Sequence, residues 1–224
     1  LKKAFSQYLS PDMVNALMAE PDRLQLGGEK KLMTIMFCDV RGFTSISEKL
    51  KSRPEVLTEV INTLLTELSQ KILETGGTID KYMGDCIMAF WNAPVLDPLH
   101  AENAVRAARA MSASVDEINQ LIEKREGENF ELKIGIGIAT GECVVGNMGS
   151  KQRFDYTVLG DVVNLASRLE GQTKAYGTTT IICNNTAKTI IGETPDIVEV
   201  DRIRVKGKQE PETIFGVFDS ALSD

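Results

Sequence analysis

Apolar and polar positions alternate along this chain with two different periods, which predicts a protein with both helices and strands. Apolar residues return every three or four positions across residues 54–75 and about 101–124, so two long helices are expected there. A third helix is expected from Asp161, which can serve as its N-cap. Strands are expected where apolar residues are continuous or alternate, namely at residues 32–40, 78–83, 86–91, 130–139, 154–159, 178–183, 197–206 and 213–218.

Glycines mark several breaks and contact points between these elements. Gly84-Asp85 suits a two-residue turn that joins the second and third strands into a hairpin. Gly27-Gly28 predicts a loop. Residues 141–149 are rich in glycine, and we expect the chain to turn there. Gly135 and Gly137 share one face of the fourth strand, which permits close approach by another backbone or by a ligand.

The chain divides into a short lead-in and one domain. Residues 1–31 are predicted to form an N-terminal helical lead-in or linker, with a helix that begins at Ser10-Pro11. This helix either couples the domain to an upstream regulatory region or simply packs on the domain. Because the chain begins at Leu1 without a methionine, we expect it to be part of a longer or processed protein. Residues 32–224 are expected to fold as the domain itself.

Composition narrows the class of protein. A chain of 224 residues that is 42% hydrophobic can bury one sizeable core. Its net charge of −7 argues against general nucleic-acid binding, which needs a basic surface. No apolar stretch approaches the roughly 20 residues of a membrane span, so no membrane contact is expected for this chain. The four cysteines form no CxxC pair and lie in apolar segments, which favours free thiols in the cytoplasm.

Two carboxylates are the first candidates for chemistry. Asp39 ends a buried apolar strand, and Asp85 lies at the tip of the predicted hairpin. If the strand and the hairpin are neighbours in one sheet, both carboxylates meet at one edge, and a cation such as Mg²⁺ or Mn²⁺ would offset their repulsion. The alternative is that Asp39 pairs with Arg41 and that Asp85 merely suits a turn. His100 is the only histidine, so a histidine-rich metal site is excluded.

Several motifs in sequence order resemble the catalytic domain of class III nucleotidyl cyclases. They are FCDVRGFT, KYMGDCIMAFW and FDYTVLGDVVNLASRLE, with VKGK further downstream. The resemblance extends over about residues 28–218. It is to bacterial homodimeric adenylate cyclases of the threonine-bearing, soluble-cyclase-like subgroup.

The resemblance implies a fold, an assembly and a metal site. It implies an α+β fold with a ferredoxin-like βαββαβ core and additional C-terminal α/β elements. Two copies would form a head-to-tail homodimer, with each active site built from both subunits. Asp39, Asp85 and the backbone of Val40 match the metal ligands, which implies two Mg²⁺ or Mn²⁺ ions per active site.

Two further residues match the positions that contact the purine base. Lys81 is a donor only, which suits the N1 acceptor of adenine, whereas guanylate cyclases have glutamate at this position. Thr157 occupies the second base position, where a hydroxyl can accept a hydrogen bond from the adenine amino group. The resemblance thus implies ATP as the substrate. Lys81 taken alone could equally be an ordinary exposed lysine on a strand.

The remaining matched residues would contact the ribose and the phosphates. Asn164 and Arg168 are four residues apart and share one helix face, where Asn164 would orient the ribose and Arg168 would stabilise charge on the α-phosphate. In isolation, this pair could instead be a capping residue and a surface ion pair. Lys206 matches the lysine that holds the terminal phosphates, with Lys208 a second candidate. The resemblance also assigns substrate contacts to two residues of the first motif, Phe43 and Thr44.

One position departs from the family pattern. Gly135 stands where many members have a basic residue, so one contact to the triphosphate is missing. Lys133 is nearby, but it is a poor substitute because it lies at a different position along the strand, and its place in the strand's alternation does not suit this contact. The expected function is conversion of ATP to 3′,5′-cyclic AMP and pyrophosphate. A catalytically silent nucleotide-binding or dimerisation module is the alternative from another class, although such modules usually lose one of the metal or transition-state residues. A guanylate cyclase is disfavoured by Lys81.

Overall fold

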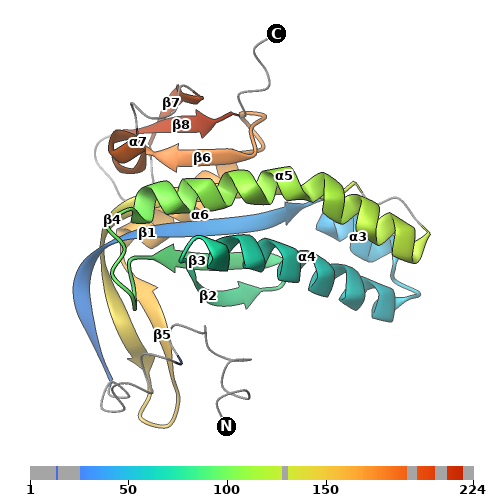
Figure 1. The fold of residues 1–224 in the computed structure, drawn as a ribbon, viewed down its shortest axis with the longest axis horizontal. Helices are drawn as coiled ribbons and strands as arrows, with labels where there is room; N and C mark the ends of the chain where they lie inside the picture. Colours follow the sequence, from blue (N-terminus) through green and yellow to red (C-terminus); the bar gives the residue numbers. More distant parts are fainter. Residues whose placement is uncertain (1–13, 15–25, 128–130, 191–195, 205–210, 219–224) are drawn as a thin grey trace.

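The protein is an α+β domain built on one mixed sheet (Figure 1). The computed structural model describes Val14 and residues 26–127, 131–190, 196–204 and 211–218. The strands are β1 (Gly27–Arg41), β2 (Thr78–Met83), β3 (Cys86–Trp91), β4 (Lys133–Gly149), β5 (Phe154–Leu159), β6 (Thr180–Cys183), β7 (Ile197–Ile203) and β8 (Glu212–Val217). The helices are α3 (Phe43–Lys49), α4 (Pro54–Glu74), α5 (His100–Glu126), α6 (Asp161–Gln172) and α7 (Asn184–Ile190).

The order of strands confirms the expected fold class. The sheet runs β2-β3-β1-β4-β6-β8-β7, and β5 pairs with β4 outside this path. In the segment from β1 to β4, α3 and α4 follow the first strand and α5 follows the third. The spatial order β2-β3-β1-β4 is the ferredoxin-like arrangement. The strands β6, β7 and β8 and the helix α7 are the additional C-terminal elements.

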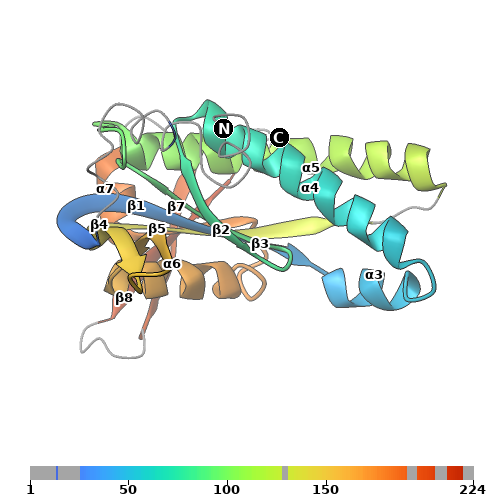
Figure 2. The same cartoon turned by 90° about the horizontal axis from the view of Figure 1, so that it is seen from below.

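Helices cover both faces of the sheet and create two apolar cores. Figure 2 shows α4 and α5 on one face and α6 on the other. The even-numbered residues of β1, such as Met36 and Cys38, belong to the core under α4 and α5. The odd-numbered residues, such as Ile35 and Phe37, belong to the core under α6. Since β1 alternates in this way, Asp39 follows the α6-facing series at the end of the strand.

Two glycine-rich segments are strands, contrary to the sequence prediction. Gly27 and Gly28 begin β1, and residues 141–149 continue β4 through the predicted turn. Gly28 pairs with Gly146, and a Cβ built on Gly146 would lie 2.1 Å from the carbonyl oxygen of Gly27. These glycines therefore allow close approach of two strand backbones rather than a loop. The long β1–β4 ladder that results extends the sheet beyond the compact core.

The other predicted elements are close to those observed, and two short helices were missed. The three long helices and the hairpin lie where the periodicity placed them. The missed helices, α3 and α7, are seven residues each, which is too short for a clear apolar period. Of the predicted lead-in helix only Val14, which is helical and buried, lies within the described residues. The division at residue 31 stays a prediction, although β1 begins before it.

Candidate active site

Asp39 and Asp85 lie at the same edge of the sheet. Cys38 pairs with Ile87 of β3, so the next residue of β1, Asp39, lies at the level of Cys86, directly after Asp85. Gly84 has a φ of 65° and comes first in the two-residue turn, which is the order of a type II′ hairpin and explains Gly-Asp rather than Asp-Gly. The strand and the hairpin thus bring the two carboxylates together as the sequence predicted.

The charges at this edge act on one another. Burial raises the pKa of Asp85, its own backbone lowers it, and the nearby charge of Asp39 raises it further. The pKa of the Cys86 thiol rises to about 12 because of burial and then because of the charges of Asp39, Glu170 and Asp85. We call Asp39, Asp85 and Glu170 the acidic cluster, since each lies within electrostatic range of the same thiol.

Glu170 was not predicted from the sequence, although it is the last residue of a motif that was. It lies on α6, and its pKa rises to about 7, first through burial and then through Asp39, while Arg41 opposes the shift. Gly135 allows this approach, because a Cβ there would lie 2.8 Å from Glu170 Oε1. At Gly137 a Cβ would lie 2.2 Å from the backbone nitrogen of Glu170. The glycine face therefore accommodates α6, through the Glu170 side chain at Gly135 and through the helix backbone at Gly137.

Two members of the acidic cluster, Asp39 and Asp85, suit divalent cations. Asp39 Oδ1 accepts a hydrogen bond from the backbone nitrogen of Val40 at 3.0 Å, which fixes the carboxylate at the end of β1. In the described part of the chain, no three His, Cys, Asp or Glu side chains have the arrangement of a complete metal site. A pair of hard carboxylate ligands suits Mg²⁺ or Mn²⁺, since Mg²⁺ keeps waters and shares its site with substrate phosphates.

Arg41 has a structural partner of its own. Its Nη2 donates a hydrogen bond to the carbonyl oxygen of Thr178 at 2.7 Å, and its charge lowers the pKa of Glu170. The guanidinium therefore ties β1 to the segment before β6. This supports the interpretation that Asp39 does not depend on Arg41 for its partner.

A second group of polar residues joins β2 to β5. Thr157 Oγ1 donates a hydrogen bond to Asp80 Oδ2 at 2.5 Å, and Lys81 Nζ lies 3.2 Å from Asp80 Oδ1. The two predicted base-contacting residues, Lys81 and Thr157, are thus brought together by a carboxylate that the sequence analysis did not single out. Burial raises the pKa of Asp80, while the contacts with Thr157, Lys81 and the backbone of Val158 lower it.

The helix α6 presents the predicted ribose and phosphate residues to solvent. Asn164 and Arg168 are both exposed, one turn apart. The N-cap of α6 is Gly160, so Asp161 is the first helical residue and not the cap that the sequence predicted. Its carboxylate in the first turn still complements the helix dipole.

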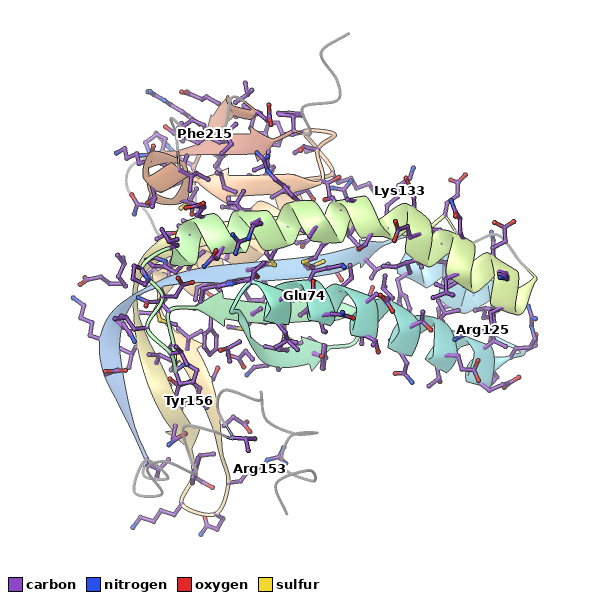
Figure 3. The ribbon with its side chains drawn as sticks, in the orientation of Figure 1. Glu74, Arg125, Lys133, Arg153, Tyr156 and Phe215 are labelled. Atoms are coloured by element: carbon purple, nitrogen blue, oxygen red, sulfur yellow. The ribbon has the colours of Figure 1, made fainter. Side chains whose placement is uncertain are left out.

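Other predicted residues lie elsewhere or outside the description. Phe43 begins α3 and packs against the core under α4 and α5, while Thr44 next to it is exposed. Lys206 and Lys208 lie outside the described residues. Lys133 lies well apart from Tyr156, the neighbour of Thr157 (Figure 3).

A hollow of about 480 Å³ lies beside the helix α5 and the start of β4. Its described lining includes Lys133, Arg41 and Asp116 but none of the predicted site residues. Lys133 thus borders this hollow, and the expectation that it is a poor substitute for a basic residue at Gly135 stays a prediction.

Comparison with known proteins identifies the family. A sequence profile of the adenylate and guanylate cyclase catalytic domain matches residues 28–216. The chain belongs to this family. It is 38% identical over 189 residues to an adenylate cyclase of Anabaena cylindrica and 35% identical over 188 residues to adenylate cyclase 1 of Rhizobium meliloti. Each match covers 83% of this chain but only 36% and 27% of those relatives, so this cyclase-family chain spans about a third of their length.

Solved structures agree with this assignment. The adenylyl cyclase CyaB from P. aeruginosa is 38% identical with a TM-score of 0.79, covering 87% of this chain and 97% of that one. The guanylyl cyclase Cya2 is 35% identical with a TM-score of 0.74, covering 86% and 94%. Because neighbours of both nucleotide classes match, only the residues of the site distinguish ATP from GTP as the substrate. In the described residues, no helix is long and apolar enough to span a membrane.

Proposed function

We propose that this domain is an adenylate cyclase that converts ATP to 3′,5′-cyclic AMP and pyrophosphate. The observation that supports this most directly is the meeting of Asp39 and Asp85 at one sheet edge, where their charges affect one another. Acidic pairs of this kind bind the divalent ions of phosphoryl transfer. The named adenylate cyclases among the relatives add support.

The acidic cluster would hold the metal ions. Two Mg²⁺ or Mn²⁺ ions bound by Asp39, Asp85 and the backbone of Val40 would lower the pKa of the ribose 3′-hydroxyl and offset the charge of the triphosphate. The buried β1 strand and the hydrogen bond from Val40 hold the Asp39 carboxylate in a fixed direction before substrate arrives. Such preorganisation reduces the cost of reaching the reactive geometry.

The other residues would bind and orient the nucleotide. Lys81 would donate to N1 of adenine, and Thr157 would accept from its amino group. On the exposed face of α6, Asn164 would orient the ribose, and Arg168 would stabilise the charge that develops on the α-phosphate. Lys206 would hold the terminal phosphates. Thr44, exposed at the start of α3, is the better placed of the two α3 candidates, since Phe43 packs into the core.

We further propose that two copies assemble head to tail, with the acidic cluster of one facing the base-contacting residues of the other. Exposed apolar side chains flank those residues: Tyr82 and Met83 follow Lys81, and Leu159 is near Thr157. Apolar side chains exposed beside a polar site are typical of a surface that a partner covers. An upstream regulatory region and a cytoplasmic location are part of the same proposal, and the four free cysteines fit a reducing compartment.

The test is turnover of ATP and GTP with Mg²⁺ or Mn²⁺, with the cyclic product identified by chromatography against 3′,5′-cyclic standards. We expect cyclic AMP and pyrophosphate in equal amounts, with ATP preferred over GTP. A silent nucleotide-binding module would bind ATP without forming cyclic AMP. Equal or greater turnover of GTP would contradict the assignment of Lys81 and Thr157.

A further inference from the structure

Asp80 is an almost fully buried carboxylate between the two residues that would contact the base. Its side chain is only 1% exposed, whereas that of Lys81 is 44% exposed. Burying a carboxylate is costly unless it is hydrogen-bonded or paired. The position of Asp80 therefore needs an explanation beyond the general fold.

A β-bulge places Asp80 beside Lys81. In the β2–β3 ladder Ile79 pairs with Ala89 and Lys81 pairs with Met88, so Asp80 is an extra residue in β2. Ile79 packs toward α4, and the hydroxyl of Tyr82 contacts Ser69 of α4, so these two residues, three apart, share one face. In a regular strand neighbours point to opposite faces, but the bulge lets the side chains of Asp80 and Lys81 lie on the same face.

Three groups converge on the Asp80 carboxylate. Thr157 Oγ1 donates to Oδ2 at 2.5 Å, the backbone of Val158 also donates to the carboxylate, and Lys81 Nζ lies 3.2 Å from Oδ1. Within the described residues, Oδ1 receives no hydrogen bond of good geometry, so the Lys81 ammonium is its nearest charge partner. Burial raises the pKa of Asp80, whereas these two donors and the cation lower it and favour the ionised carboxylate, which can only accept hydrogen bonds.

This arrangement decides which hydrogen bonds Thr157 can still make. A threonine hydroxyl has one proton and two lone pairs, and its proton is directed at Asp80. The hydroxyl can therefore accept a hydrogen bond from a ligand but cannot donate one. The 6-amino group of adenine is a donor, whereas the 6-oxo group of guanine is an acceptor.

We propose that Asp80 is a positioning residue that selects adenine over guanine, by holding the Thr157 hydroxyl as an acceptor and the Lys81 ammonium beside it. This inference rests on the proposed roles of Lys81 and Thr157 in the cyclase site. Asp80 itself is buried and acts through its two neighbours rather than on the nucleotide. A purely structural link between β2 and β5 would stabilise the fold without affecting the choice of base.

The test compares the binding of 3′-deoxy-ATP and 3′-deoxy-GTP to the 224-residue chain by calorimetry with Mg²⁺ present. These nucleotides lack the attacking hydroxyl, so they bind without turnover. In Asp80→Asn the amide either donates to Thr157, whose proton then turns outward, or directs its NH₂ group at the Lys81 ammonium. Both orientations weaken the preference for adenine, and we expect the ratio of the two dissociation constants to fall about tenfold, as for the loss of one hydrogen bond.

A matched control separates this effect from lost stability. Asp196→Asn removes another poorly exposed carboxylate, which pairs with Arg109 at 3.5 Å. We expect this variant to lose stability and keep the adenine preference. Thr157→Val should weaken the preference to a similar degree, and adding Asp80→Asn to it should change the ratio little further, because the two residues act through one hydroxyl.

Each result decides between the alternatives. A folded Asp80→Asn variant with the wild-type ratio would overturn the inference, as would equal changes in Asp196→Asn. If Asp80→Asn does not fold, Thr157→Val decides, since an unchanged ratio there means that the hydroxyl does not select the base. Failure of the wild-type chain to bind either nucleotide would contradict the proposed function itself, whereas binding with no effect of Asp80→Asn contradicts only this inference.

Discussion

At the scale of single residues, the proposed metal ligand Asp39 repels its acidic neighbours. Its charge raises the pKa of Asp85, Glu170 and the thiol of Cys86, so the acidic cluster is mutually repulsive without a cation. A sequence selected for stability alone would not place carboxylates together at the end of a buried strand. Their presence there is best explained by an ion that offsets the repulsion when substrate is bound.

Asp39→Asn should separate the effect of this carboxylate on activity from its effect on stability. The amide still offers an oxygen to the backbone nitrogen of Val40, but the negative charge is lost. We expect cyclic AMP formation to fall at least ~100-fold, because a ligand of the metal ions is lost. In EDTA the melting temperature should stay the same or rise, because the repulsion is relieved. Circular dichroism measures the melting temperature, and an assay with Mg²⁺ measures cyclic AMP formation. Near-wild-type activity would contradict the role of Asp39.

At the scale of elements, the packing of α6 on β4 depends on glycines. Gly137 leaves no room for a Cβ, which would lie 2.2 Å from both the carbonyl oxygen of Ala166 and the backbone nitrogen of Glu170. These are backbone atoms, so a larger residue has to displace the helix. Because α6 also presents Asn164 and Arg168, its position links the core to the proposed chemistry.

Gly137→Ala is therefore expected to destabilise the domain by at least ~2 kcal/mol through overpacking and to lower the turnover number. Gly171→Ala, on the helix α6 that Gly137 contacts, is the control, since a Cβ there meets nothing within 4 Å. It should raise the free energy of unfolding by about 0.5–1 kcal/mol, because alanine favours helix more than glycine. Urea unfolding of both variants measures this, and similar effects of the two changes would show that the close approach has no energetic importance.

A buried polar network joins β1, β4, α5 and α7. The Nδ1 atom of His100 lies 2.7 Å from Thr34 Oγ1, which lies 2.8 Å from Thr140 Oγ1, and Thr140 continues to Thr186 Oγ1. Burial lowers the pKa of His100, although the charge of Asp97 opposes the shift. The folded state thus holds this histidine neutral at pH values where the unfolded chain protonates it.

The stability contributed by His100 is consequently expected to depend on pH. A folded-state pKa below the unfolded value means that this stability is present above about pH 6.5 and is lost as pH falls through the folded pKa. His100→Asn keeps a polar group near Thr34 but does not titrate. The difference in free energy of unfolding between wild type and this variant should shrink from pH 8 to pH 5. A difference that is constant across this range would contradict the prediction.

Local patterns predicted most elements, and long-range contacts account for what was missed. The apolar period of α4 and the hairpin around Gly84-Asp85 depend on neighbouring residues, so the sequence shows them directly. Gly28 and Gly146 looked like loop residues because a glycine that permits a turn and one that permits close strand approach are identical in sequence. Only the pairing of distant strands distinguishes the two.

The residues of the candidate site likewise divide into those that local sequence patterns indicate and those that depend on contacts between distant segments. Asp39, Asp85, Lys81 and Thr157 lie in recognisable motifs. The structure brings Asp39 near Asp85 and joins Lys81 to Thr157 through Asp80, while their roles stay predictions. Asp80 and Glu170 were missed because their significance depends on a bulge in β2 and on how closely α6 approaches β4. Neither feature leaves a local pattern, although both residues lie next to or within those motifs.

At the scale of the whole molecule, the proposed site residues form two groups within one chain. The acidic cluster lies at the end of β1, while the base-contacting residues lie between β2 and β5 and are joined through Asp80. In a head-to-tail dimer with twofold symmetry, each active site takes its acidic cluster from one subunit and its base-contacting residues and Arg168 from the other. Two such sites form per dimer.

This arrangement predicts that two inactive variants restore activity when mixed. In a dimer of Asp39→Asn with Arg168→Ala, one site receives both substitutions and the other receives neither. Random assembly of equal amounts makes half of the dimers mixed, each with one intact site of two, so activity should recover to about one quarter of the wild-type value. Asp39→Asn mixed with Asp85→Asn is the matched control, because both substitutions affect the acidic cluster and every site stays defective. Native mass spectrometry verifies that mixed dimers form, and a coupled pyrophosphate assay measures recovery. Mixed dimers without activity would mean that each subunit builds its own site. Equal recovery in the control would mean that Asp39 and Asp85 of one subunit do not serve the same active site, which would contradict the acidic cluster.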